Sequence, residues 1–179
     1  MPAFDSDQVQ KSTNQIDWTL LQNGFVTKFC STNILEKSVT WLRDFGYEIV
    51  EIETSDWASE SDIHLDFAAA FSFPDYYGRN LNALRDCLRD VAEYSYGSNR
   101  DSTGTVLVLN HYDRFLHKDA DLAEDVLDIF ADTARLAALI GHRMICLVQS
   151  NDPAIEIRPV GATPVVWNRE EFLNSSRGQ

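Results

Sequence analysis

Apolar positions fall into two patterns along this chain: short runs, and longer segments in which they recur every three or four residues. Runs lie at 24–30, 105–110 and 143–149, and their β-branched and aromatic residues are typical of strands. Residues 105–110, "TVLVLN", are too apolar for a half-exposed strand. We therefore predict a strand there that is buried on both faces of a covered sheet.

The segment that follows the first run has helical periodicity. Leu35, Val39 and Leu42 recur at helical spacing, and Gly46 follows where a glycine ends many helices. One residue of the preceding "STN" is expected to cap this helix, and "YEIVEIET" at 47–54 is the next predicted strand. Further helices are expected at 62–71, after Asn80 and from about 121 to 140, followed by a strand in "TPVVW" and a short helix in "NREEFLN".

Strands and helices alternate along most of the chain, so the predicted fold class is α/β. Four to five strands separated by helices favour a parallel or mostly parallel sheet with helices on its faces. With 179 residues, the chain has the length of one well-buried domain, and we expect a single domain over 1–179. Residues 1–15 are polar and are expected to be loosely held.

Acidic residues outnumber basic ones by 28 to 15, which gives a formal net charge of -13. Such a surface repels phosphate backbones and anionic lipids, so we expect neither direct nucleic-acid binding nor membrane binding. A basic protein is the natural partner for this charge. The polar start of the chain is unlike a secretory signal, and no stretch approaches the roughly 20 apolar residues that span a bilayer, so a cytoplasmic location is expected.

Residues with catalytic or metal-binding chemistry form no recognisable motif. Histidines and aspartates gather between 111 and 121, but their spacing fits no familiar metal site, and "DLAE" at 121–124 is interpreted as a capping box that starts a helix. Cys30, Cys87 and Cys146 are widely spaced and form no CxxC pair, which suits reduced thiols. We therefore predict no metal site, no cofactor and no enzymatic activity.

The most informative stretch is "FPDYYGRNLNALRDCL" at 73–88. Asn80 is suited to cap the helix that follows, and Gly78 allows a tight approach of the chain. Leucines 81, 84 and 88 fall on one stripe, which we expect to be buried. The outward face carries Asn82, Asp86 and Asp90 at intervals of four, beside a second row formed by Arg85 and Arg89.

This stretch closely resembles the signature of the barstar family, the cytoplasmic inhibitors of secreted ribonucleases. Similarity extends over about 47–149, with an added strand and helix at 24–46 and a C-terminal addition at 155–174. The resemblance implies a three-layer α/β domain with a three-stranded parallel sheet. It also implies that the loop and helix of 73–88 plug the cationic active site of a ribonuclease, where carboxylates replace the substrate phosphates.

The resemblance assigns partner contacts to individual positions, with Asp86 as the principal phosphate-mimicking carboxylate. Four positions depart from the family pattern: Asn82 replaces an acid, Arg85 an aromatic residue and Val91 a tryptophan, and Arg79 stands where the best-known member has an acid. Asp90 is expected to restore some of the lost negative charge. The predicted contact residues are Tyr76, Gly78, Asn80, Asn82, Arg85, Asp86, Asp90, Ile129 and Asp132.

The sequence thus predicts an immunity or self-protection factor that inhibits a basic ribonuclease or toxin domain, as a monomer or weak homo-oligomer. The alternative is an interaction module of the same fold that regulates a basic protein other than a ribonuclease. Plainer interpretations of single residues remain open. Asp86 has the spacing of an ordinary helical ion pair with Arg89. Asp132 can be one more acid on a solvated helical face. At least one of Tyr76 and Tyr77 is expected to pack on the core.

Overall fold

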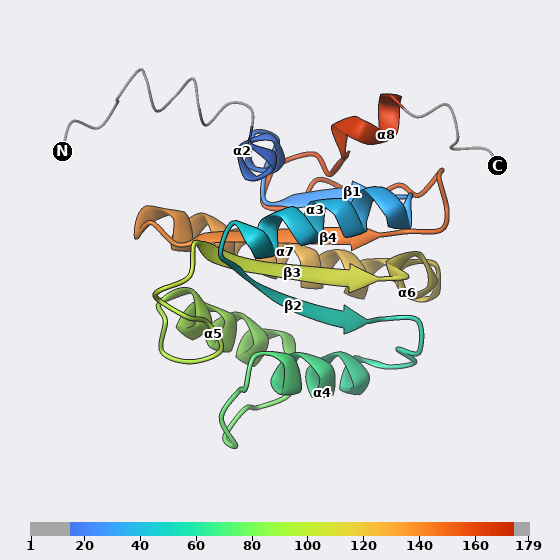
Figure 1. Ribbon diagram of the computed structural model, residues 1–179. Helices are drawn as coiled ribbons and strands as arrows, with labels where there is room; N and C mark the ends of the chain where they lie inside the picture. Colours follow the sequence, from blue (N-terminus) through green and yellow to red (C-terminus); the bar gives the residue numbers. More distant parts are fainter. Residues whose placement is uncertain (1–14, 174–179) are drawn as a thin grey trace.

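A sheet of five parallel strands forms the centre of the molecule (Figure 1). In this computed structural model, which describes residues 15–173, the strand order is β2-β3-β4-β1-β5. The α/β class and the parallel sheet predicted from the sequence are confirmed. The strands are β1 (Val26–Phe29), β2 (Tyr47–Glu53), β3 (Gly104–Asn110), β4 (Arg143–Gln149) and β5 (Val166–Trp167).

Helices cover both faces of the sheet, so the protein has three layers. One face packs against α2 and α3, and the opposite face against α4, α5, α6 and α7. Within residues 15–173, no helix combines the length and the apolar content needed to cross a membrane. The helices are α2 (Ile16–Leu21), α3 (Thr32–Asp44), α4 (Glu60–Ala70), α5 (Leu81–Ala92), α6 (Tyr112–Lys118), α7 (Ala120–Leu139) and α8 (Arg169–Leu173).

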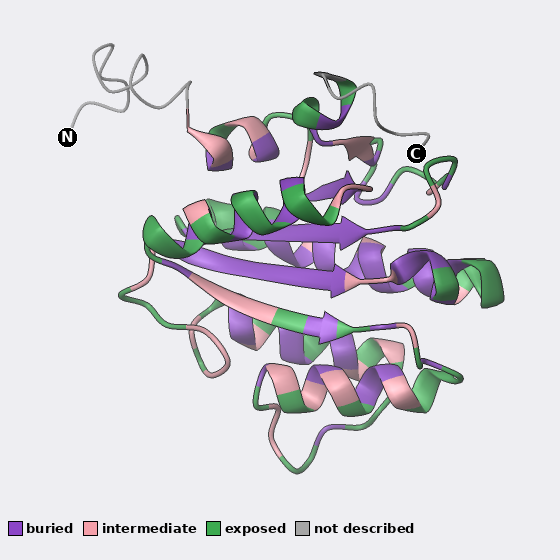
Figure 2. Ribbon diagram, turned by 45° about the vertical axis from the view of Figure 1, so that its right-hand side comes forward, coloured by how far each residue is buried: buried purple, intermediate pink, exposed green. Residues whose placement is uncertain are grey.

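Strand β3 divides the two hydrophobic cores. Val106 and Val108 point into the core under α3, whereas Leu107 and Leu109 point into the core shared by α4 to α7. All four side chains are buried, which confirms the prediction of a strand enclosed on both faces (Figure 2). Because successive side chains of a strand point to opposite faces of the sheet, the apolar residues of β3 contribute to the hydrophobic core on each face.

Two short helices, α2 and α6, are not predicted by the sequence pattern, and the predicted start of α7 is wrong. The six residues of α2 and the seven of α6 are too short to establish a clear period. Because α6 ends at Lys118, the next residue serves as the cap of α7, and Asp119 accepts a hydrogen bond from the Leu122 amide at 3.1 Å. The capping box predicted at 121–124 is therefore wrong. The prediction that residues 1–15 are loosely held falls, except for Gln15, outside the described residues.

The N-terminal strand and the C-terminal helix join on one side of the sheet. Strand β1 pairs with β4 and β5, so the strand added before residue 47 continues the sheet beyond β4. The buried Glu171 carboxylate of α8 accepts from the backbone amides of Cys30 and Ser31, both at 2.9 Å. It satisfies amide groups at the start of α3 that would otherwise lack partners.

Candidate functional site

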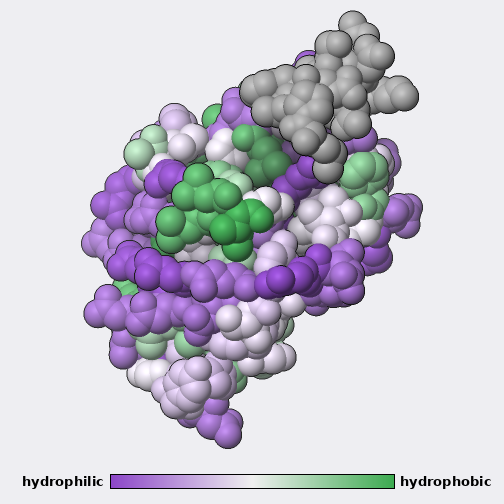
Figure 3. Space-filling view, turned by 90° about the vertical axis from the view of Figure 1, so that its left-hand side faces the viewer, coloured by the Kyte–Doolittle hydropathy of each residue, from purple (hydrophilic) through white to green (hydrophobic). Residues whose placement is uncertain are grey.

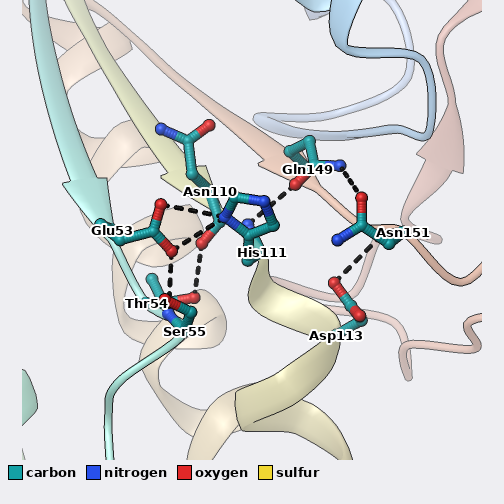
Figure 4. Close-up of polar contacts among 8 residues, drawn as sticks. All are labelled: Glu53, Thr54, Ser55, Asn110, His111, Asp113, Gln149 and Asn151. Atoms are coloured by element: carbon teal, nitrogen blue, oxygen red, sulfur yellow. Dashed lines mark hydrogen bonds and ion pairs between the residues drawn. The ribbon is translucent and has the colours of Figure 1, made fainter.

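Open parallel sheets usually bind ligands at the carboxyl ends of their strands. Here a hydrogen-bond network joins those ends, and Figure 4 shows its residues pointing toward one another. Both carboxylate oxygens of Glu53 lie 2.9 Å from His111 Nδ1, and the His111 amide donates to Gln149 Oε1 at 2.9 Å. Gln149 donates in turn to Asn151 Oδ1, and the Asn151 amide donates to Asp113, each at 3.0 Å. The network uses these polar groups internally.

The histidines and aspartates near residue 111 serve structure in the same way. His111 and Asp113 belong to the network just described, and His117 lies 3.2 Å from the Asp152 carboxylate. Among residues 15–173, no group of three or more His, Cys, Asp or Glu side chains has the arrangement to hold a metal ion. The more promising surface lies elsewhere, on the loop before α5 and on α5 itself.

The loop before α5 is anchored by Tyr77. Its hydroxyl lies 2.5 Å from Nδ1 of the buried His64, whose Nε2 lies 3.1 Å from the Glu60 carboxylate. The Tyr77 ring also packs edge-on against Phe73. Burial raises the pKa of Tyr77 far above its ordinary value, so the phenol keeps its proton. The loop is thus held to α4 by a buried side chain.

The next residues turn the loop outward. Tyr76 is 79% exposed, so one tyrosine of the pair packs and the other remains available, as expected from the sequence. A Cβ placed on Gly78 would lie 3.3 Å from Asn80 Nδ2 and 3.4 Å from the Cβ of Ala83, so these two side chains leave it little room. The left-handed residue, however, is Arg79, with φ of 48°, an uncommon conformation for a residue that is not glycine.

Helix α5 begins at the predicted cap. Asn80 Oδ1 accepts from the Ala83 amide at 2.9 Å, and Asn80 Nδ2 donates to the Gly78 carbonyl. Leu84 and Leu88 are fully buried, which fixes the rotation of the helix about its axis. Cys87 is also buried, and burial raises the pKa of its thiol, so it is a packing residue as predicted. The outer face of α5 is therefore presented on a rigid element.

Asp86 stands on that outer face. Its side chain is exposed, and no hydrogen bond or ion pair joins it to any residue within 15–173, so the possible ion pair with Arg89 is not formed. Asn82 is exposed on the same helix. Asp90 is half-buried and accepts from the Tyr96 hydroxyl at 3.1 Å, so part of its hydrogen-bonding capacity is used internally.

Helix α7 packs beside α5 and contributes the other predicted contact positions. Ile129 is 2% exposed and belongs to the core, which leaves almost no side-chain surface for a partner to touch. Asp132 is half-buried and accepts from Arg135 at 3.0 Å. Between the two helices, Arg85 of α5 and Asp132 of α7 line a groove of about 210 Å³. The structure thus brings Arg85 and Asp132 together across this groove.

Two parts of this surface were missed by the sequence analysis. One is the contact between His64 and Tyr77, while the nearby Asp66 accepts from the Trp57 indole at 2.7 Å. The other is Arg135, which lines the groove with Asp132. No local spacing signals either contact, because each depends on how separate elements pack.

Comparison with known proteins adds two findings. A family model described as "Barstar (barnase inhibitor)" matches residues 47–149, which confirms the resemblance inferred from the sequence over the same range. A solved chain from "Structure of Drosophila ORC bound to DNA" has a TM-score of 0.53 at 12% sequence identity. That alignment covers 90% of the present chain but only 41% of the Drosophila chain, and at this identity the likeness concerns the fold alone.

Proposed function

The chain belongs to the barstar family, and from this premise we propose that it inhibits a cationic ribonuclease by covering its active site. The surface that binds the enzyme is the loop from Phe73 to Asn80 together with the outer face of α5. In this role the protein is an immunity or self-protection factor against a ribonuclease toxin. It acts as a binding protein, without a catalytic step of its own.

The state of Asp86 supports this proposal most directly. It is an exposed carboxylate on a capped, well-packed helix, and it has no ion-pair or hydrogen-bond partner within residues 15–173. A carboxylate that only stabilised α5 would be expected to pair with Arg89, which lies one turn away. An unpaired and rigidly placed charge is instead ready to meet a partner with little loss of conformational entropy.

The chemistry of a ribonuclease site suits this carboxylate. Such a site holds phosphates with arginine, lysine and histidine side chains, and an aspartate can accept charge-assisted hydrogen bonds from the same groups. Once water is excluded, a central charge pair of this kind can dominate binding. The exposed Tyr76 ring adds apolar area beside the carboxylate, while the buried Tyr77 keeps the loop in place.

A second candidate is an interaction module of the same fold that regulates a basic protein other than a ribonuclease. The observation that favours it is the change of charge on the proposed face. Asn82 and Arg85 stand at positions where the family resemblance implies an acid and an aromatic residue. These changes argue against a target surface identical to that of barnase.

The proposal is tested with purified protein and a panel of small basic ribonucleases that includes barnase. We expect inhibition of at least one enzyme, and we expect Asp86→Ala to speed dissociation by about tenfold or more, because most interface mutations act on the off-rate. Asp44→Ala is the matched control, since Asp44 is an exposed aspartate that ends α3 on the opposite face of the sheet. Its dissociation rate should equal that of the wild type.

Co-expression gives the cellular form of the same test. Cells that produce a toxic ribonuclease should survive with the wild-type chain and grow poorly with the Asp86→Ala variant. If no ribonuclease on the panel is inhibited, or if Asp86→Ala and Asp44→Ala dissociate at equal rates, Asp86 is not the central contact and the plug mechanism is rejected.

A further inference from the structure

Two arginines of α5 line the groove against α7 without a partner of their own. Arg85 and Arg89 are one helical turn apart, and both are exposed at the groove. Within residues 15–173, neither guanidinium group takes part in a hydrogen bond or an ion pair. Other exposed arginines within residues 15–173, among them Arg79 and Arg114, are also unpaired, so the feature that distinguishes Arg85 and Arg89 is their shared place in a groove.

The acid that shares the groove does not neutralise them. Asp132 accepts from Arg135 at 3.0 Å, and Arg135 also donates to the Gly161 carbonyl, so this third arginine is fixed beside the acid. The groove walls therefore carry three guanidinium groups against one carboxylate. Its local charge is positive, opposite in sign to the protein as a whole.

The outer face of α5 is consequently divided by charge. Successive residues of a helix are rotated by about 100°, which places Arg85 and Arg89 on the side toward α7 and Asp86 with Asp90 on the side away from it. Asn82 lies between the two rows. A partner that covers the whole face must meet an acidic row and a basic groove side by side.

We propose that the groove between α5 and α7 receives an acidic side chain, glutamate or aspartate, from the ribonuclease that the protein inhibits. This inference depends on the proposed function, because Asp132, which lines the groove, and Asp86, on the same helix as its two arginines, are predicted contacts. An enzyme that covered both would desolvate Arg85 and Arg89, and burial of unpaired guanidinium groups is costly. A carboxylate from the enzyme removes that cost and forms charge-assisted hydrogen bonds with planar guanidinium groups.

The surroundings of the groove favour a protein side chain over a free anion. Leu136 lines the groove, and Leu139 and Ile140 follow it at the end of α7 with exposed fractions of 80% and 58%. Figure 3 views the side of the molecule where α7 ends and shows a hydrophobic patch bordered by hydrophilic surface. An acidic residue with apolar neighbours on the enzyme would match both parts of this surface, the arginine groove and the apolar patch beside it. Protein interfaces commonly combine an apolar core with a polar rim in this way.

The groove can be tested on the purified protein without any ribonuclease. The probe is N-acetyl-glutamate amide, the neutral control is N-acetyl-glutamine amide, and the readout is the NMR signal of each arginine Nε–Hε group. We expect saturable shifts of Arg85 and Arg89 with the acidic probe alone, and loss of binding in the Arg85→Gln/Arg89→Gln variant. Equal responses to both amides, no shift at these arginines, or binding that survives in the double variant would overturn the assignment.

A second measurement separates this inference from the proposed function. With a ribonuclease that the chain inhibits, Arg85→Gln/Arg89→Gln should weaken binding by about tenfold to a hundredfold, while Arg114→Gln on α6 should leave it unchanged. If Asp86→Ala weakens the complex and the double arginine variant does not, the groove proposal fails and the inhibitor proposal stands. If no ribonuclease is inhibited, the inhibitor proposal fails, and the amide titration still decides the chemistry of the groove.

Discussion

The carboxyl edge of the sheet and the outer face of α5 are both polar, but their polar groups find partners in different places. At the edge, Glu53, His111 and Gln149 are bonded to one another (Figure 4). On α5, Asp86 and Arg85 have no partner within residues 15–173. The edge therefore uses its polar groups within the fold, whereas α5 leaves two charged side chains open to solvent.

The energetic reason is that satisfied and unsatisfied groups respond differently to substitution. Removing one partner of a buried hydrogen bond leaves the other without a replacement, and the folded state loses free energy. Removing a solvated surface charge changes the free energy of unfolding little, because that group is hydrated in both the folded and the unfolded state. In the free protein, substitutions at the sheet edge should therefore lower the free energy of unfolding more than substitutions on α5. For binding of a partner, substitutions on α5 should have the larger effect.

The largest effect on stability is expected from Gln149→Leu. Gln149 is 1% exposed, accepts from the His111 amide and donates to Asn151. Leucine has a similar size but no polar atoms, so both neighbours lose a partner, and we expect a loss of about 2 kcal/mol in the free energy of unfolding. Urea denaturation measures this, and a loss below about 0.5 kcal/mol would mean that the edge network is not structural.

A smaller effect should separate two substitutions of His111. This residue has φ of 57°, which glycine adopts without strain and alanine does not. His111→Ala and His111→Gly both remove the contact with Glu53, so we expect the glycine variant to be more stable by about 1 kcal/mol. Thermal and urea unfolding of the pair give the difference. Equal stability of the two variants would contradict the left-handed backbone at this position.

The pH dependence of Glu53 provides a third test. Burial alone would raise the pKa of Glu53, but hydrogen bonds from Ser55 and His111 outweigh it, and the pKa lies below its ordinary value. The folded state then binds this proton less readily than the unfolded state, so the stability that Glu53 contributes is present above the unfolded pKa of about 4.3 and is lost as pH falls through the folded pKa.

We therefore expect the stability advantage of the wild type over Glu53→Gln to shrink on acidification below about pH 4.3. The effect should be modest, because the Glu53 side chain is 49% exposed and solvent screens its interactions. Urea unfolding of both proteins across a pH series measures the difference. A constant difference across that series would show that the carboxylate gains nothing from the network.

The smallest effects on folding are expected on α5. Asp86→Ala and Arg85→Ala should each change the free energy of unfolding of the free protein by no more than about 0.5 kcal/mol, since both side chains are solvated. The same two substitutions are expected to weaken binding of a ribonuclease. A large loss of folding stability in either variant would assign that residue to structure and remove the contrast between the two regions.

Local sequence patterns predicted the elements that present the candidate site. The apolar run of β3, the Asn80 cap and the buried leucines of α5 all follow from rules that involve residues close together in the chain. Tyr76 and Tyr77 divide into one exposed and one packed ring, as predicted. Such features are predictable because each depends on the backbone within one or two turns.

Features that join distant segments could not be read in the same way. The contact between His64 and Tyr77 requires α4 and the following loop to fold back on each other. The arginine groove exists only because α5 and α7 lie side by side, and its positive charge opposes the charge of the whole chain. Its two walls come from α5 and α7, which are separate in the sequence, so no local pattern of residues indicates that they lie together.

The position of β1 also constrains the order in which the protein can assemble. Val26 pairs with Cys146, and Thr27 with Val166, so both strands that pair with β1 are synthesised only after most of the chain has left the ribosome. Strands β2, β3 and β4 are adjacent in the sheet and consecutive in the chain, so they can pair earlier. During synthesis, α3 can already pack on β2 and β3 through the core that it shares with them, whereas β1 can dock only as one of the last steps of folding.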